Sequence, residues 1–202
     1  IYEDNSGRLW IGTENGLNIF NREKEKFISI KLPISSNGIN ESLIVESILE
    51  DKVTKKILVA TNYGLYSLTS SNYNAPLSNF QIELINSNEF RWATHLYQTE
   101  DGIIWLISNY ILYSYDSEND NIIPFPITLS YKNSILEDSS GIIWIGSSSK
   151  GVFSFDRKKK GFTLYNHNPD DIFSIGGNLV QCVYEDRSGN LWVGARLTGI
   201  NK

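Results

Sequence analysis

The sequence predicts an all-β fold, a β-propeller built from four-stranded antiparallel blades. One stretch occurs three times with small changes, as "EDNSGRLWIGTENGLNIF" at 3–20, "EDSSGIIWIGSSSKGVFSF" at 137–155 and "EDRSGNLWVGARLTGI" at 185–200. Aromatic residues make up 12% of the chain, and abundant Tyr, Trp, Phe and Ile favour strands over helices. No amphipathic helical stretch of convincing length separates the copies. A repeated unit of short strands is therefore the expected building block.

Five copies can be aligned on one anchor position, which is Trp in four of them. The anchors are Trp10, Leu58, Trp105, Trp144 and Trp192. They recur about every 39 to 48 residues, which is the period of propeller blades. The repeats are expected at 1–43, 44–91, 92–131, 132–178 and 179–202, and the last of them is incomplete. The whole chain is thus expected to be part of one propeller domain.

Each repeat is expected to contain four strands. In the fourth copy, an apolar segment at 134–138 leads through a tight turn to a strand at 142–146. A polar loop then precedes a strand at 151–155, and a polar turn leads to the last strand at 161–165. The basic run at 157–160 is expected at the solvated tip of this last hairpin. Such units cannot bury both faces alone, so they must stack on one another.

The tight turn of each copy is expected to depend on an Asp and a Gly. The pairs are Asp4/Gly7, Asp138/Gly141 and Asp186/Gly189, with Asp101/Gly102 as a shortened version. An Asp before a tight turn can accept backbone N–H hydrogen bonds, and Gly can adopt the positive φ that such a turn requires. The anchor Trp is expected to be buried where one blade packs against the next.

These stretches resemble a known family. "NHNPDDIFSIGGNLVQCVYEDRSGNLWVGARLTGI" (166–200) and "IYEDNSGRLWIGTENGLNIFN" (1–21) resemble two-component regulator propeller repeats. Copies one, four and five match strongly. Copy two lacks the Gly and the Trp of its turn-and-strand core, and in copy three Tyr110 stands where Gly is expected.

The resemblance implies a fold and a function. Such repeats form seven-bladed propellers, so four blades and part of a fifth would be a fragment. They make up the periplasmic sensor region of hybrid two-component histidine kinases of Bacteroidetes-like bacteria, which resemble oligosaccharide sensors that regulate polysaccharide-utilisation genes. The implied partners are an oligosaccharide, further blades and a second sensor domain of the same protein, and a second copy in a homodimer. The kinase would lie outside this segment.

Composition and charge exclude some classes of partner. Hydrophobic residues make up 41% and charged residues 20%, as in an ordinary globular protein. A net charge of −5 argues against nucleic acid or an anionic membrane as a partner of this segment. No stretch approaches 18 uninterrupted apolar residues. The single cysteine, Cys182, has apolar neighbours and is expected to be a small buried side chain.

Catalysis and metal binding have weak support. "ILEDSSGIIW" (135–144) is close to the Asp box of sialidases, but there that box is a folding device and catalysis uses other residues. Glu-Asp pairs recur at the turns, which favours a structural role over the paired carboxylates of a glycosidase. The two histidines, His95 and His167, are far apart in the sequence, and we expect no metal site, cofactor or enzyme activity.

A ligand is expected on the face that carries the turns between second and third strands and the loops between blades, because these parts vary most. Aromatic rings suit the C–H faces of sugars, and Asn and Arg suit their hydroxyls. The candidate residues are Asn62, Tyr63, Arg91, Trp92, Asn109, Tyr110 and Arg196. The alternative is a structural or protein-interaction propeller that mediates domain packing or dimerisation without a ligand of its own.

Overall fold

The computed structural model describes residues 1–33, 42–69, 80–85, 90–130 and 133–202. In these residues every regular element is a strand, which confirms the predicted all-β fold. The described residues contain no helix long and apolar enough to cross a membrane. The chain divides into two compact units, Ile1–Phe125 and Pro126–Lys202.

The first unit contains three four-stranded antiparallel sheets, which are blades 1 to 3. Blade 1 has β1 (Tyr2–Glu3), β2 (Leu9–Thr13), β3 (Gly16–Asn21) and β4 (Lys26–Ile30). Blade 2 has β5 (Val45–Glu50), β6 (Ile57–Thr61), β7 (Gly64–Thr69) and β8 (Gln81–Ile85). Blade 3 has β9 (Ala93–Gln98), β10 (Ile104–Ser108), β11 (Ile111–Asp116) and β12 (Asn121–Thr128), whose last residues belong to the second unit.

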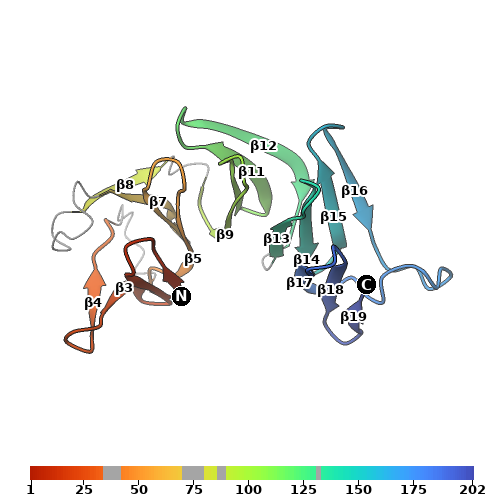
Figure 1. The fold of residues 1–202 in the computed structure, drawn as a ribbon, viewed down its shortest axis with the longest axis horizontal. Coiled ribbons are helices and arrows are strands. Elements are labelled where there is room, and N and C mark those ends of the chain that lie inside the picture. Colours follow the sequence, from red (N-terminus) through yellow and green to blue (C-terminus); the bar gives the residue numbers. More distant parts are fainter. Residues whose placement is uncertain (34–41, 70–79, 86–89, 131–132) are drawn as a thin grey trace. The chain divides into compact units, whose positions relative to one another are not determined.

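The second unit contains blades 4 and 5. Blade 4 has β13 (Asn133–Glu137), β14 (Ile143–Ser147), β15 (Gly151–Asp156) and β16 (Gly161–Tyr165), of which β15 and β16 run side by side in Figure 1. Blade 5 has three strands, β17 (Val180–Glu185), β18 (Leu191–Ala195) and β19 (Gly199–Asn201). The basic run at 157–160 forms the β15–β16 turn, as expected, and there Arg157 pairs with Glu137 of β13.

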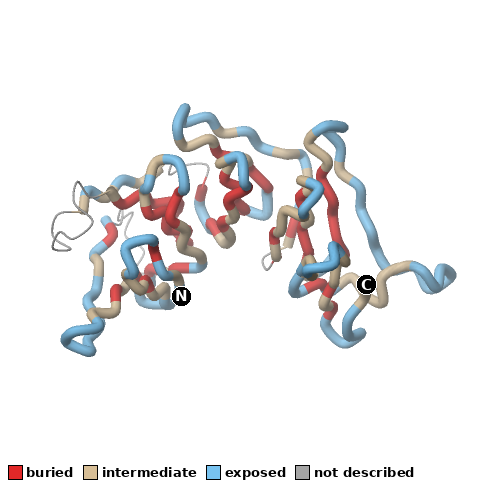
Figure 2. The backbone as a smooth tube through the Cα atoms, in the orientation of Figure 1, coloured by how far each residue is buried: buried red, intermediate tan, exposed pale blue. Residues whose placement is uncertain are grey.

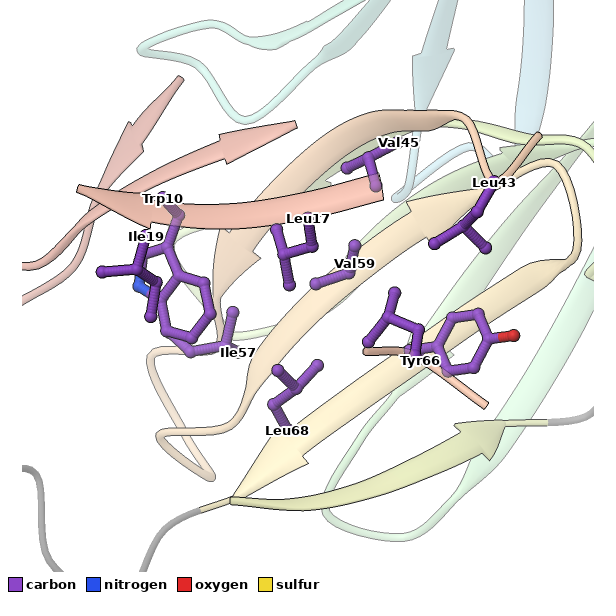
Figure 3. Packing of buried hydrophobic residues seen from close by; sticks show 10 residues of the cluster. Trp10, Leu17, Ile19, Leu43, Val45, Ile57, Val59, Tyr66 and Leu68 are labelled. Carbon is purple, nitrogen blue, oxygen red and sulfur yellow. The ribbon is translucent and has the colours of Figure 1, made fainter. Parts of the chain in front are cut away.

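The most buried residues of each blade lie on its middle strands. All five residues of β6 are buried, whereas β4 and β16 are mostly exposed (Figure 2). Between blades 1 and 2, Trp10, Leu17 and Ile19 point toward residues of β6 and β7 (Figure 3). Trp10 is fully buried in this blade-to-blade contact, as predicted, whereas the anchors Trp144 and Trp192 are only half-buried. Burying one such large apolar side chain stabilises the fold by roughly 1.5–3 kcal/mol.

The Asp-Gly turn forms as predicted, and its Asp also accepts a hydrogen bond from the anchor Trp. In blade 1 the Oδ1 atom of Asp4 accepts the backbone N–H groups of Ser6 and Arg8, at 3.0 and 2.9 Å. Its Oδ2 atom accepts the indole N–H of Trp10 at 2.8 Å. Gly7 has a φ of 78°. The same bonds join Asp138 to Trp144 and Asp186 to Trp192, each at 2.7 Å, so one carboxylate fixes both the turn and the anchor ring.

In two of the copies the Glu before the Asp binds the neighbouring blade. A Glu50 oxygen accepts the backbone N–H of Asn5, which follows Asp4, at 2.6 Å. Glu185 accepts the N–H of Ser139, which follows Asp138, at 2.8 Å. Between blades 2 and 3 the acceptor is Gln98, which takes the N–H of Lys52 at 2.7 Å. Glu50 and Glu185 thus hold the previous blade, whereas Glu3 and Glu137 pair with Arg22 and Arg157 of their own blades.

Copy two compensates for its missing Trp and Gly. Its turn is one residue longer, and Lys55 takes the left-handed backbone position with a φ of 61°. The Asp51 carboxylate accepts Gln98 Nε2 at 2.6 Å and the hydroxyl of Ser117, both from blade 3. Burial raises the pKa of Asp51, but hydrogen bonds from Ser117, Thr54, Val53 and Gln98 outweigh it and hold the pKa below its usual range.

Three sequence-based expectations are wrong. The turn of copy three is not shortened, since Thr99 occupies the Asp position and its carbonyl accepts the N–H of Gly102 at 3.0 Å. Ile111, not Tyr110, stands at the Gly position, because Ser108 pairs with Ile111 as Thr61 pairs with Gly64. Cys182 is exposed rather than buried, because its side chain lies on the open side of β17, against Gly194.

Candidate functional site

The predicted ligand-binding residues of blades 2 and 3 come from two turns and the segment that begins β9. Asn62 and Tyr63 form the β6–β7 turn, Asn109 and Tyr110 form the β10–β11 turn, and Arg91 and Trp92 directly precede β9. We call Tyr63, Arg91, Trp92, Asn109 and Tyr110 the loop cluster. Arg196 lies in the second unit, in the β18–β19 turn, and is described separately below.

Asn62 lies under the loop cluster and is hydrogen-bonded to the backbone of Trp92. It is buried, its Nδ2 donates to the carbonyl of Ser42, and its Oδ1 accepts the N–H of Ile44, both at 2.9 Å. Its backbone carbonyl accepts the N–H of Trp92 at 3.2 Å. Asn62 thus ties three segments of the first unit together, and its amide is engaged within the protein rather than presented to a ligand.

Arg91 and Trp92 are held between the two turns. The hydroxyl of the buried Ser108 donates to the carbonyl of Arg91 at 2.5 Å, while Trp92 is bonded to Asn62. The side chain of Arg91 is exposed, and Trp92 is 40% exposed with a φ of 52°. An aromatic ring is therefore fixed at the surface on a left-handed backbone residue, a conformation that costs roughly 1–3 kcal/mol.

The β10–β11 turn differs from its counterpart in blade 2. There the positive φ falls on Gly64, after the two turn residues, whereas in blade 3 Ile111 replaces that glycine. Asn109 and Tyr110 instead take positive φ values of 48° and 65°, the pattern of a type I′ turn. Tyr110 is consequently presented at the surface, 53% exposed. Tyr63, its counterpart, is only half-exposed and packs against the core of blades 1 and 2.

Arg196 is exposed, and its backbone N–H donates to the carbonyl of Leu179 at 2.8 Å. In the first unit, hydrogen bonds to the backbone of Arg91 and Trp92 bring these two residues together with both turns. Sequence reasoning missed Ser108, which holds Arg91 in place. The sequence shows only a Ser at the end of an apolar strand, which does not indicate a bond to Arg91.

The described ranges contain no group of three or more His, Cys, Asp or Glu side chains close enough to hold a metal ion. His95 lies in β9, where burial lowers its pKa. His167 has a structural role, since its Nδ1 lies 2.8 Å from the carbonyl of Ile175. The Asp and Glu side chains described above are engaged in turns and blade contacts.

Comparisons with known proteins agree with the repeat pattern. The family model of the two component regulator propeller matches residues 1–15, 127–149 and 174–196. No curated protein matches the chain. The matched segments are the Asp-Gly turns and their flanking strands in blades 1, 4 and 5, the copies whose sequences are most alike.

Solved structures share the fold. The extracellular domain assigned to the hybrid two component system BT4673 of B. thetaiotaomicron is 23% identical, with a TM-score of 0.71. That of BT3049 from the same organism is 20% identical, with a TM-score of 0.70. The match covers 96% of this chain and 25% of each of those chains.

The WD40 propeller domain of Doa1 has a TM-score of 0.64 at 13% identity, over 96% of this chain and 59% of that one. A fold that persists at so low an identity depends on the blade architecture and not on particular loop residues. The chain therefore has a β-propeller fold, and three of its segments match the two component regulator propeller model.

Proposed function

We propose that the chain is a ligand-sensing propeller module of a hybrid two-component signalling protein, located in the periplasm. It responds to an oligosaccharide and regulates polysaccharide-utilisation genes through a kinase outside this segment. The repeat family and the likeness to extracellular domains of such systems support the signalling context. The ligand is argued from the loop cluster.

One observation carries the ligand proposal, namely that the blade 3 side of the loop cluster departs from the repeat. Trp92, Asn109 and Tyr110 all have left-handed backbones although none is Gly. Such strain persists where the surroundings enforce it, and it concentrates at ligand-binding sites. Here the surroundings are the buried Asn62 and Ser108, which hold the segment from both sides.

The exposed chemistry of the cluster fits a sugar. Trp92 and Tyr110 present ring surface that can cover the C–H face of a pyranose. Arg91 and Asn109 are exposed donors for hydroxyl or carboxylate oxygens. Because hydrogen bonds to Asn62 and Ser108 already hold the backbone of Trp92 and Arg91, less backbone entropy is lost on binding. For a signal to follow, the sugar must bind one arrangement of the full sensor more tightly than another.

A thermal-shift screen of the chain against neutral and acidic oligosaccharides tests the proposal. A ligand at about 100 times its dissociation constant adds roughly 2.7 kcal/mol of apparent stability. We expect this shift to be lost in Trp92→Ala and Tyr110→Asn, the second of which keeps a residue that tolerates positive φ. The matched control is Tyr184→Ala, which removes an exposed aromatic ring from β17. A shift that survives both loop variants contradicts the proposed site, and no shift with any sugar contradicts sugar sensing.

A protein-interaction propeller is the second candidate, and one loop favours it. Ile172 and Phe173 are 89% and 90% exposed, although their loop is ordered by hydrogen bonds between Asn168, Asp171 and Ser174. Two apolar side chains held in solvent by a structured loop are typical of a protein contact. If the partner is a second copy of the chain, sedimentation velocity will show a dimer that Phe173→Ser dissociates. A monomer at all concentrations contradicts homodimerisation.

A further inference from the structure

Two blade contacts use a Glu at the same position but provide it with different donors. Between blades 4 and 5, the two oxygens of Glu185 accept the backbone N–H and the hydroxyl of Ser139, at 2.8 and 2.6 Å. Between blades 1 and 2 the corresponding residues are Glu50 and Asn5, and the backbone N–H of Asn5 donates to Glu50 Oε2 at 2.6 Å. Asn5 has no hydroxyl for the second oxygen. Within the described ranges, the Glu50 carboxylate accepts this one hydrogen bond.

Glu50 is nevertheless the more buried of the two carboxylates. It is 4% exposed, whereas Glu185 is half-buried and has two donors. A buried carboxylate oxygen without a donor raises the free energy of the folded state, so such oxygens are normally hydrogen-bonded in proteins. The second oxygen of Glu50 therefore needs a donor that the described part of the chain does not supply.

The Glu50 carboxylate lines a cavity on the side of the Asp turns. The cavity has a volume of about 520 Å³ and is lined by Asn5 and Ser6 of the β1–β2 turn, Glu50 at the end of β5, and Lys55 of the β5–β6 turn. Both turns belong to the first unit, and they lie at the opposite end of the strands from the loop cluster. The volume falls within the roughly 300–1,000 Å³ of small-molecule pockets.

The oxygens of the cavity suit a ligand that donates several protons. The Ser6 hydroxyl donates its own proton to Asp4 Oδ1 at 2.7 Å, so Ser6 Oγ acts towards a ligand as an acceptor. The Asn5 side chain is exposed and offers a carbonyl oxygen. Together with Glu50, these residues provide acceptors for the N–H groups of an ammonium. Lys55 brings a positive charge to the same cavity, so a second ammonium group on the ligand is repelled.

We propose that this cavity binds a small molecule with one ammonium group, an amine or a free amino acid, whose ammonium donates to the second oxygen of Glu50. Such a hydrogen bond is charge-assisted, and burial of the carboxylate strengthens it relative to the same bond in water. The inference goes beyond the proposed sensor function and does not depend on it, because both the ligand class and the residues differ.

The test uses probes of nearly equal size, namely ethanolamine, the neutral ethylene glycol and the anionic glycolate, with putrescine as a diamine. The readout is the ¹H–¹⁵N spectrum of the full chain. We expect the amide signals of Asn5 and Ser6 to shift with ethanolamine, less with putrescine, and not with ethylene glycol or glycolate. In Glu50→Gln the affinity for ethanolamine should fall about tenfold, because a charge-assisted hydrogen bond is lost.

A second variant tests the site without removing a charge. In Asn5→Ser the new hydroxyl should donate to the second oxygen of Glu50, as Ser139 does to Glu185, and so abolish ethanolamine binding. This variant adds an internal hydrogen bond, so it decides the question even if Glu50→Gln fails to fold. The matched control is Glu23→Gln, which removes an exposed carboxylate from the β3–β4 turn and should leave binding unchanged.

The outcomes separate this cavity from the loop cluster. Shifts of equal size with ethylene glycol overturn the ammonium assignment, and binding that survives in Asn5→Ser overturns the role of Glu50. An equal loss in Glu23→Gln shows a general charge effect and overturns the site. Absence of shifts with every probe shows that the cavity holds solvent. None of these results bears on Trp92 and Tyr110, whose own amide signals report on the loop cluster.

Discussion

The substitution Gln98→Glu should destabilise the first unit, although Glu is the residue at this position in the other four copies. Gln98 Nε2 donates to Asp51 Oδ1 at 2.6 Å and to the carbonyl of Gly102 at 2.8 Å. Asp51 is fully buried and Gln98 nearly so. A glutamate in place of Gln98 would lose both donated bonds and bring a second carboxylate against that of Asp51. The substitution that agrees best with the repeat is thus expected to be harmful here.

The size of the effect follows from two estimates. Two like charges about 4 Å apart repel by roughly 4 kcal/mol at the effective dielectric of about 20 that suits protein sites. The alternative is to protonate the introduced glutamate at about pH 7, which costs about 4 kcal/mol from an ordinary pKa near 4.3. The folded protein adopts whichever of these two states costs less, and both cost about 4 kcal/mol, so the free energy of unfolding should fall by about that amount. For a chain of this size the melting temperature should then fall by roughly 10 °C.

Denaturant unfolding at about pH 7 and near pH 4.5 provides the assay. The pKa of the introduced glutamate would be raised in the folded state, so the penalty exists above its ordinary pKa and shrinks as the pH falls towards that value. Gln81→Glu, an exposed change in β8, is the matched control and should alter stability by less than about 0.5 kcal/mol. A loss below about 1 kcal/mol at neutral pH, or a loss that does not depend on pH, would refute the reasoning.

Two further predictions concern the Asp turns. Trp10→Phe should lower the free energy of unfolding by about 1–3 kcal/mol, because the buried indole N–H donates to the Asp4 carboxylate. Trp92→Phe, at the surface, should change the free energy of unfolding little. Urea unfolding of both variants measures the difference. Hydrogen bonds from Trp192 and then Asn190 lower the pKa of Asp186, and the pKa of Asp51 is lowered as described above. The stability these groups add is present above their ordinary pKa of 3.8 and is lost as the pH falls below it, so urea midpoints measured from about pH 6 downward should decline there. Midpoints that stay constant through that range would contradict the assignment.

Local chemistry made the turn predictable from sequence. Asp4, Gly7 and Trp10 occupy fixed offsets, and a tight turn permits few residues at each of them. The all-β class followed from the same repetition, together with the strand-favouring composition. The second bond of Asp4, to the Trp10 indole, was not predicted, because it depends on the relative placement of two strands rather than on the turn alone.

The errors have the same origin. In copy three the letters "EDG" suggest a shifted turn, but the hydrogen bonds of the β9–β10 turn put Thr99 at the Asp position. The pairing of β10 with β11 likewise puts Ile111 at the position where β3 and β7 begin with Gly. Cys182 was judged by its apolar neighbours, yet a bulge at Gln181 changes which side of β17 each residue faces. A one-residue irregularity reverses strand burial, and sequence does not show it.

The candidate site divides in the same way. The sequence predicts Trp92 and Tyr110 as ligand-binding residues because they depart from the repeat, and it gives no sign that Asn62 is buried and bonded to the backbone of Trp92. By itself the sequence determined the repeat, its turns and the class of fold, since these depend on neighbours along the chain. Only the tertiary structure decided which polar side chains join blades and which face solvent, because residues about 45 positions apart form those contacts.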